Sequence, residues 1–330
     1  MPAAAINPDK ILKELRELWI SMGKSQEGSG GVLRACSMTL LVAADSHAGD
    51  IAPADGINDD AAQVHQIIGA LMHQHPSRAV VLAPLPEADL SARVFSECWM
   101  PYHSRQQICA EGIEITYDPE QSDEVARLLV PLLAPDLPVV LWCRGPRAFL
   151  DRSLDPLFPL ARKIIFNTSP VRHAPSAIEF LRRLRDDDRR VADLAWTQLT
   201  GWRRAIASAF DAAPLASGFS LVRIQHGGDR APTGAYYMAR WMERSLPGLS
   251  VIIESVAGEP GLRNILFSGT QPALSLQPAL SFQEVAPRML EVNTGSRVYQ
   301  TSLPATTEED LMYEELSILD RDPVFERVLE

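Results

Sequence analysis

Three histidines, His65, His73 and His75, lie close together in the chain and could serve as metal ligands or proton carriers. His73 and His75 are two positions apart, so on a helix they would face different directions and would not share a metal ion. Neither an H-E-x-x-H nor a C-x-x-C pattern accompanies them. We therefore interpret these histidines as surface or capping residues and expect no metal site.

The cysteines form a second group of reactive side chains. Cys98, His103 and Cys109 follow a C-x4-H-x5-C spacing, which matches no zinc-binding pattern. We interpret Cys98 and Cys109 as small apolar residues on strands or at strand edges. Cys36 and Cys143 complete the set, and four cysteines are few for 330 residues, which is typical of a reducing cytoplasm.

Motifs for nucleotide binding or hydrolysis are incomplete in this sequence. Segment 23–25 reads Gly-Lys-Ser, but Leu18 stands where a phosphate-binding loop needs glycine, and a helix is expected before it instead of a strand. The glycines between 28 and 31 do not follow the dinucleotide fingerprint, and no G-x-S-x-G segment occurs. We predict no catalytic residue, no cofactor and no metal, which favours a binding or regulatory protein over an enzyme.

The elements that would position any site follow from apolar periodicity. Helices are predicted at 11–19, 59–73, 122–133, 154–161, 175–185 and 233–246, two helical pieces are predicted within 194–210, and two more helices begin at Thr306 and at Asp322. Strands are predicted at 36–43, 79–83, 94–100, 113–117, 139–142, 163–168, 219–225, 249–255, 263–267, 279–284 and 297–300. Helices interleaved with short strands indicate an α/β fold.

The charged run at 182–190 is the best candidate for a domain boundary. We predict two α/β domains, at 1–188 and 189–330. The first should contain a mixed, mostly parallel sheet flanked by helices, because no helix is expected between the strands near residues 94 and 113. The second should be a smaller mixed α/β domain.

Composition limits the classes of partner. The chain has 31 Lys+Arg against 42 Asp+Glu, a formal net charge of -11. Clustered cations are what phosphate backbones attract, so neither nucleic acid nor a membrane is an expected partner. No run reaches the about 18 apolar residues of a membrane helix, and the first residues lack the basic and apolar regions of a signal peptide. A soluble cytoplasmic protein is expected.

Five segments together resemble a known family. They are HPSRAVVLAP from His75, CAEGI from Cys109, LLAPDLPVVLW from Leu132, DLAWTQLTGWRRAIASAFD from Asp193 and ELSILDRDPVFE from Glu315. In order and spacing they resemble the OpcA family, the glucose-6-phosphate dehydrogenase assembly proteins, over about residues 10 to 329. The D-L-x-W-T-x-L-x-x-W-R segment is the most specific of them.

The resemblance implies a regulatory partner without catalysis of its own. OpcA proteins resemble an allosteric or assembly subunit that binds glucose-6-phosphate dehydrogenase and raises its activity in the oxidative pentose phosphate pathway, a branch of carbohydrate metabolism. In some photosynthetic bacteria this control is tied to thiol redox state, and Cys109 stands at a family cysteine position, which makes it the candidate redox residue. The chain departs from many relatives at Cys143, where they have a second tryptophan, and at Gly201, where proline is frequent.

Two segments offer candidate residues for binding a partner or a ligand. His75, Ser77 and Arg78 precede a predicted strand and could present a hydroxyl, amide groups and a guanidinium to an anion, or could only set an extended backbone before the strand. Trp142 and Arg144 lie at the carboxyl end of another predicted strand, where α/β sheets place ligands.

The DLAWT segment supplies the remaining candidates. Trp196 belongs either to the core or to a partner surface. Arg203 and Arg204 suit interface ion pairs or sugar-phosphate oxygens, although a solvated helix face is the simpler explanation for each of them. Thr200 is predicted to cap a helix that starts at Gly201. An apolar stripe is expected at Trp202, Ile206 and Phe210.

Three functions remain open from the sequence. The first is a regulatory subunit that binds and activates glucose-6-phosphate dehydrogenase. The alternative is an enzyme, a sugar-phosphate-binding hydrolase or lactonase with a non-local active site. The third is an α/β sensor that binds a metabolite and has a different protein partner. A pocket that gathers several titratable groups would favour the enzyme.

Overall fold

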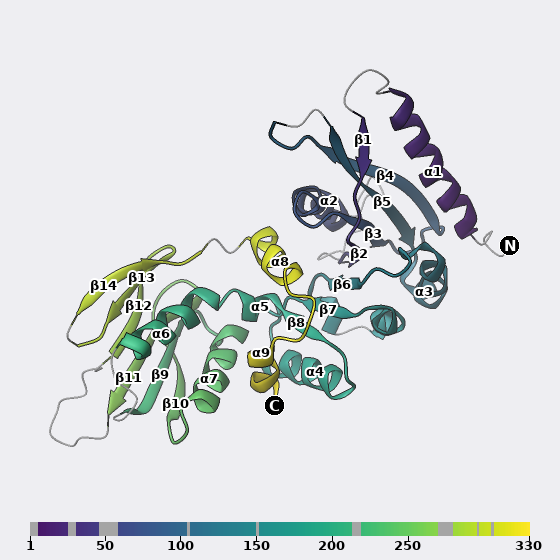
Figure 1. Cartoon of the computed structure of the whole chain (residues 1–330). Helices are drawn as coiled ribbons and strands as arrows, with labels where there is room; N and C mark the ends of the chain where they lie inside the picture. Colours follow the sequence, from purple (N-terminus) through teal and green to yellow (C-terminus); the bar gives the residue numbers. More distant parts are fainter. Residues whose placement is uncertain are drawn as a thin grey trace. The chain divides into compact units, whose positions relative to one another are not determined.

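The chain divides into two units in the computed structural model (Figure 1), which describes residues 6–25, 31–45, 59–103, 106–149, 152–212, 219–269, 280–295, 297–304 and 307–330. The first unit comprises Met1–Asn167, Arg189–Val191 and Glu315–Asp320, and the second comprises Thr168–Asp188, Ala192–Glu314 and Arg321–Glu330. The chain therefore passes between the units more than once. A single boundary at residue 188 stays a prediction.

The first unit is built on a mostly parallel sheet. Its strands are β1 (Val32–Arg34), β2 (Met38–Ala43), β3 (Ser77–Pro84), β4 (Ser91–Trp99), β5 (Gln107–Tyr117), β6 (Val139–Cys143) and β7 (Lys163–Phe166), and the sheet continues into β8 (Val191–Asp193), whose last two residues belong to the second unit. They follow the order β1-β5-β3-β2-β6-β7-β8, and β4 pairs with β5. The β2, β3, β5 and β6 pairings are parallel, whereas β4 runs antiparallel to β5, so the predicted mixed sheet is confirmed. Every residue of β2 and β3 is buried, as expected for strands covered on both faces.

Helices flank this sheet. They are α1 (Pro8–Ser25), α2 (Asp59–Met72) and α3 (Ser122–Leu129). α1 packs against β4, and α2 packs against β3. The helix predicted at 154–161 is a 3-10 helix over Arg152–Leu160, with Pro156 and Pro159 inside it. Each proline removes an amide donor that an α-helix would need, which explains the tighter winding.

The second unit contains a mixed six-stranded sheet and several helices. The helices are α4 (Ala174–Asp186), α5 (Leu194–Thr197), α6 (Thr200–Ala212), α7 (Thr233–Ser245) and α9 (Pro323–Leu329), and α8 spans Glu308–Leu316. The strands are β9 (Phe219–Gly227), β10 (Ser250–Ser255), β11 (Gly261–Gly269), β12 (Leu280–Ala286), β13 (Met289–Asn293) and β14 (Val298–Ser302). Their order is β10-β9-β11-β12-β13-β14, and only the β10 and β9 pair is parallel.

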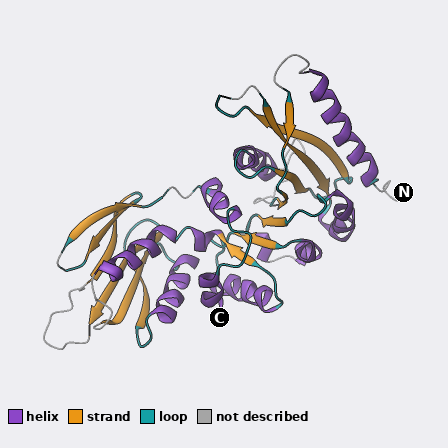
Figure 2. Ribbon diagram, viewed as in Figure 1, coloured by secondary structure: helices purple, strands orange, loops and turns teal. Residues whose placement is uncertain are grey.

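One face of this second sheet is apolar and packs under helices. Val222, Ile224 and Phe267 are fully buried, and Phe210 of α6 makes an edge contact with Phe267 at 5.3 Å between ring centroids. α7 packs against β9 and β10, and Figure 2 shows α6 and α7 along the sheet. The stripe predicted on α6 is therefore part of the core. β1, β8 and β13 were not predicted, because runs of three to five residues are too short to show a clear apolar periodicity.

Three residues, Asp322, Thr306 and Thr200, were predicted to cap the starts of helices. Asp322 caps α9 by accepting the amides of Val324 and Phe325, as predicted, with Pro323 at the first helical position. Thr306 lies outside the described residues, and the capping box in the structure joins Thr307 and Asp310. The Thr200 prediction is wrong.

The reason lies in the surroundings of Thr200. α6 already begins at Thr200 rather than at Gly201. The Thr200 hydroxyl donates to Glu314 at 2.8 Å and accepts from Arg203 at 3.0 Å. Its side chain therefore joins two segments that are distant in sequence.

Cys98 and Cys109 form a disulfide, so their interpretation as unpaired apolar residues is wrong. The antiparallel register of β4 and β5 places the two residues directly opposite each other. Cys36 and Cys143 are free, and burial raises the pKa of the Cys143 thiol. A redox role of Cys109, through reversible reduction of this disulfide, stays a prediction.

Candidate functional site

A pocket of about 390 Å³ lies within the second unit. Its walls come from the ends of α5 and α7, the first turn of α6, the start of β11, the hairpin between β12 and β13, and the segment after β14. Sites for small molecules are usually about 300–1,000 Å³, so the volume suits a compact ligand. Ser169 completes the lining, and the end of α5 and the first turn of α6 form one continuous stretch, so the described lining comes from six stretches that are separate in sequence.

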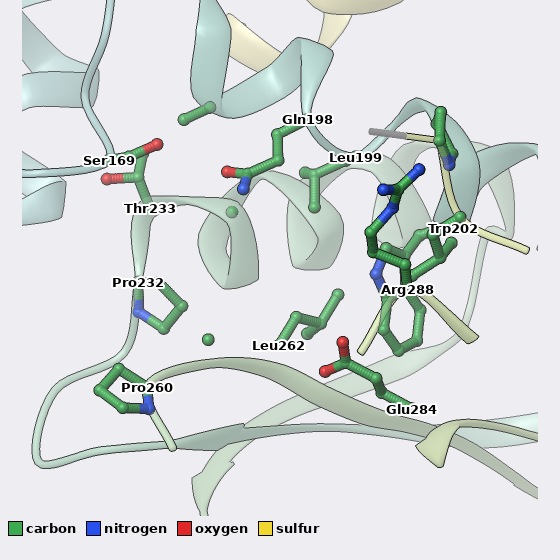
Figure 3. Close-up of a pocket in the computed structure, with 15 residues that line it drawn as sticks. Ser169, Gln198, Leu199, Trp202, Pro232, Thr233, Pro260, Leu262, Glu284 and Arg288 are labelled. Atoms are coloured by element: carbon green, nitrogen blue, oxygen red, sulfur yellow. The ribbon is translucent and has the colours of Figure 1, made fainter. Parts of the chain in front are cut away.

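Polar groups lie at both ends of the pocket. Figure 3 shows Ser169, Gln198 and Thr233 toward one end, and Glu284 and Arg288 toward the other. Among the described residues that line the pocket, Glu284 and Arg288 alone carry charge. Glu284 accepts a hydrogen bond from Arg263 at 3.1 Å.

The walls between these ends are apolar and stiff. Trp202, Leu262 and three prolines, Pro232, Pro260 and Pro304, line the pocket. Proline has a fixed φ, so little conformational freedom is left to lose when a ligand binds. The cavity is therefore largely preformed.

Arg288 occupies an unusual backbone conformation. It lies in the two-residue turn between Ala286 and Met289, which pair with each other, and its φ is 63°. Such turn positions favour glycine or asparagine, because a Cβ is strained there. The Arg288 side chain is exposed, and within the described residues it has no hydrogen-bond or ion-pair partner. Because the backbone strain at Arg288 is retained beside a cavity, its guanidinium is a candidate binding group.

Asp193, the first residue of the DLAWT segment, is a buried carboxylate that joins three parts of the second unit. It accepts hydrogen bonds from the Thr168 amide at 3.0 Å, the Thr168 hydroxyl at 2.5 Å, the Ala195 amide at 3.0 Å and the Tyr237 hydroxyl at 2.6 Å. Burial raises the pKa of Asp193, and these four donors oppose that rise only in part. The group is structural, because it is enclosed on all sides.

Trp196, from the same segment, is a core residue. Its indole stacks on Phe325 at 5.5 Å and meets Tyr237 edge-on at 6.2 Å between ring centroids. The indole N–H donates to Asp322 at 2.8 Å, and the Arg203 guanidinium lies 3.7 Å from the ring centroid. The segment that carries the strongest family resemblance therefore holds α5, α7 and α9 together.

The Tyr237→Phe variant should reveal the ionisation of Asp193. Removing the hydroxyl takes away a donor that stabilises the carboxylate more than the acid, at a cost of about 1.5–3 kcal/mol when Asp193 is charged. The pKa of Asp193 is raised in the folded state, so the folded protein holds the proton of this carboxyl more tightly than the unfolded chain does. The stability that the protonated Asp193 contributes therefore falls as pH rises above about 4, the ordinary aspartate pKa.

Urea unfolding at about pH 5 and about pH 8 checks this expectation. The variant should lose more stability, relative to the natural protein, at the higher pH. Tyr236→Phe, on the same helix, is the matched control. Equal losses at both pH values would contradict the assignment.

The first sheet has a reversal of strand order next to β2. The series β5-β3-β2-β6-β7-β8 is that of a doubly wound fold, in which ligands bind at the carboxyl ends where the order reverses, here between β2 and β6. Arg144 follows β6 at this place and forms an ion pair with Asp60 at 2.8 Å, near the start of α2. Asp60 also accepts the Asp45 amide at 2.7 Å.

This ion pair changes what the crevice can bind. A helix start normally attracts phosphate through its free amides and positive dipole end. Here a carboxylate stands in the first turn of α2, and Arg144 is 6% exposed and lies over Trp142, with its Cζ 4.8 Å from the ring centroid. In the described part of the crevice, the candidate residues Trp142 and Arg144 are engaged with the protein itself.

Arg78 has a similar internal role at the amino end of β3, the end of the sheet opposite to the crevice. Its guanidinium donates to Glu111 at 2.6 Å and to the Leu132 carbonyl at 2.8 Å. Glu111 also accepts from Trp19 and from Arg34, each at 2.6 Å. Burial alone would raise the pKa of Glu111, but the Trp19 hydrogen bond and the two guanidinium groups lower it below the ordinary range.

The other predicted residues occupy separate places. His75 is half-buried and Ser77 is buried beside Arg78 at the start of β3, and Cys109 lies in β5. Arg204, on α6, is the exposed member of the candidate set. None of these residues lines the pocket. Among the residues that the structure describes, no group of three His, Cys, Asp or Glu side chains could hold a metal ion.

Comparison with known families decides the relationship. Residues 69–186 match the model of the glucose-6-phosphate dehydrogenase subunit N-terminal domain, and residues 189–329 match that of the C-terminal domain. The chain belongs to the OpcA family. No match was found among curated proteins.

Solved structures resemble the OpcA-family chain only distantly. A 3-ketoreductase, KijD10 from Actinomadura kijaniata, shares 8% identity at a TM-score of 0.44, covering 88% of this chain and 94% of that one. The WlbA dehydrogenase from Thermus thermophilus shares 11% identity at 0.42, covering 89% and 93%. Biliverdin reductase from Synechocystis shares 8% identity at 0.42, covering 90% and 95%.

The sequence predicted none of the pocket residues of this OpcA-family chain as binding groups, and it assigned Trp202 to an apolar core stripe. Gln198 and Trp202 belong to the DLAWT region, but their approach to Glu284 and Arg288 depends on the sheet register. A signal for Arg288 did exist: Ala-Pro-Arg-Met between two apolar stretches resembles a tight hairpin turn. No described helix of the chain is both long enough and apolar enough to cross a membrane.

Proposed function

We propose that this chain is a non-catalytic cytoplasmic subunit that binds glucose-6-phosphate dehydrogenase and raises its activity. The observation that carries the proposal is the match of residues 69–186 and 189–329 to the two domains of a glucose-6-phosphate dehydrogenase subunit. The dehydrogenase itself is the partner that those domain names indicate.

The crevice of the first unit supports a role without catalysis. The Arg144 and Asp60 pair places a carboxylate at the start of α2, where a bound dinucleotide would need an uncovered positive helix end. The pocket of the second unit is compatible with this role, because Glu284 is the single carboxylate of its described lining and neither histidine nor cysteine stands beside it.

Activation requires differential binding. A subunit raises the activity of an enzyme at equilibrium only if it binds the active state or assembly more tightly than the inactive one. Preference by a factor of ten corresponds to about 1.4 kcal/mol, which a few contacts in an interface of about 800 Å² per partner can supply.

Purified dehydrogenase from the same organism, assayed with and without this chain, tests the proposal. We expect co-elution of the two proteins on size exclusion and a higher kcat/KM in the mixture. An unrelated acidic protein at equal concentration is the control, because the net charge of -11 could act non-specifically. Unchanged kinetics together with separate elution would reject the proposal.

The alternative, a sugar-phosphate hydrolase or lactonase, takes its only support from the pocket that holds Glu284 and Arg288. Incubating the isolated chain with a sugar-phosphate ester or a phosphorylated lactone distinguishes the two functions. Turnover by the isolated chain, abolished in Glu284→Gln, would favour the enzyme.

A further inference from the structure

We propose that the pocket of the second unit binds a small phosphorylated polyhydroxy compound, a sugar phosphate or phosphorylated sugar acid. The proposal concerns the isolated chain and goes beyond the dehydrogenase partnership. Only the choice of glucose 6-phosphate as the first probe rests on the proposed function.

The volume and the walls of the pocket limit the ligand to a compact, partly hydrated molecule. About 390 Å³ is near the lower end for small-molecule sites. The Trp202 indole and Leu262 form a wall against which the C–H face of a sugar ring can pack, while the polar side chains at the two ends remain for its substituents (Figure 3).

One end of the pocket can hold the phosphate. α7 begins there, at Thr233 and Gly234, with Pro232 at its cap position, no side-chain cap and no acidic residue in its first turn. No acidic side chain in the first turn of α7 therefore competes with a phosphate for the first amides of the helix and for its positive dipole end. The Thr233 hydroxyl is held by the Thr168 carbonyl at 3.1 Å, which fixes this corner.

Gln198 adds a side-chain amide at the same end. It lines the pocket, is exposed, and makes no side-chain hydrogen bond with another described residue. An amide donor without a protein partner beside a helix start is available to a phosphate oxygen.

The other end can bind the hydroxyl groups. Glu284 accepts hydrogen bonds, and one of its oxygens is already held by Arg263, so its position is set. Arg288 contributes donors and positive charge from a turn where glycine would be less strained. A donor and an acceptor at the same end of the pocket can serve different hydroxyls of a sugar, and the charge of Arg288 also attracts a carboxylate of a sugar acid.

Calorimetric titration of the isolated chain tests the proposal, with glucose 6-phosphate, 6-phosphogluconate, inorganic phosphate and glucose as probes. We expect the two phosphorylated sugars to bind with a millimolar or lower Kd and to raise the Tm, inorganic phosphate to bind more weakly, and glucose not to bind. Tighter binding of 6-phosphogluconate than of glucose 6-phosphate would identify a sugar acid as the preferred ligand.

Two variants locate the site. Gln198→Glu places a negative charge at the phosphate end with almost no change of shape, and should weaken binding by more than about 30-fold. Arg288→Gly removes the guanidinium from a position whose φ suits glycine, so the fold is retained, and should weaken binding by about tenfold. The matched controls, Gln74→Glu and Arg297→Gln, change the same charges at exposed residues outside the pocket and should bind as the natural protein does.

The outcomes separate this proposal from the proposed function. Absence of binding by both phosphorylated sugars, or binding that neither pocket variant weakens, overturns the ligand site. Dehydrogenase activation measured in parallel reports on the partnership alone. Activation without ligand binding would overturn only the pocket proposal, and ligand binding without activation or co-elution would overturn only the proposed function.

Discussion

Replacing Glu111 by glutamine should lower the free energy of unfolding by about 3–5 kcal/mol, because it leaves a buried guanidinium without its counter-charge. Arg78 is 7% exposed and Glu111 is 1% exposed, so water cannot replace the lost carboxylate. Glu111 also holds the Trp19 indole and Arg34, which tie α1 and β1 to β5.

The same variant has a pH signature. The pKa of Glu111 is lowered in the folded state, so its contribution to stability is complete above the ordinary glutamate pKa of about 4.3 and is lost as pH falls through the lower folded value. The difference between the natural protein and Glu111→Gln, measured by urea unfolding, should therefore shrink in acid.

Glu114→Gln is the control for this prediction. Glu114 lies on the same strand and pairs with His65 and with Arg93, whose side chain is 68% exposed. Solvent can replace that partner, so the loss should be about 1 kcal/mol. Similar losses in Glu111→Gln and Glu114→Gln would show that burial of Arg78 is not the cause.

The Trp196→Ala variant should destabilise the second unit by about 3–5 kcal/mol. The substitution leaves a cavity beside Phe325 and Tyr237, removes the surface over which Arg203 lies, and takes away the N–H that Asp322 accepts. Urea unfolding followed by far-ultraviolet circular dichroism measures the loss without relying on the fluorescence of the tryptophan that is removed.

Two further variants divide this effect into its parts. Trp196→Phe keeps an aromatic ring against Phe325 but loses the indole N–H, so it should cost less than Trp196→Ala. Asp322→Ala loses the same hydrogen bond and the cap of α9, at a cost of about 0.5–2 kcal/mol. If Trp196→Ala unfolds like the natural protein, Trp196 is not the packing centre of α5, α7 and α9.

The candidate residues show why a role in internal packing and a role in binding are hard to tell apart from sequence. Arg78, Arg144 and Trp196 have the chemistry of binding residues, and the structure engages each of them with protein groups. Arg204 alone among the candidate set is exposed, which leaves it as the candidate most accessible to a partner. A partner contact through Arg204 stays a prediction.

Local patterns in the sequence determined the α/β class, the mixed first sheet and most helix and strand positions. Apolar periodicity and caps act over a few residues, so segments such as Met38–Ala43 and the Asp322-Pro323 start of α9 could be predicted from neighbours alone. The resemblance to the OpcA family likewise rested on segments of contiguous sequence, and the family models matched across them.

Tertiary structure alone decided the partners of the side chains. The Cys98 and Cys109 bond depends on the register of two antiparallel strands, and the Glu111 and Arg78 pair joins residues 33 positions apart. The pocket forms only when α5, α6 and α7 lie beside the start of β11 and the hairpin between β12 and β13. Such contacts arise from the packing of whole elements, and a change of register by one residue turns a side chain to the other face of a sheet, so no local pattern specifies them.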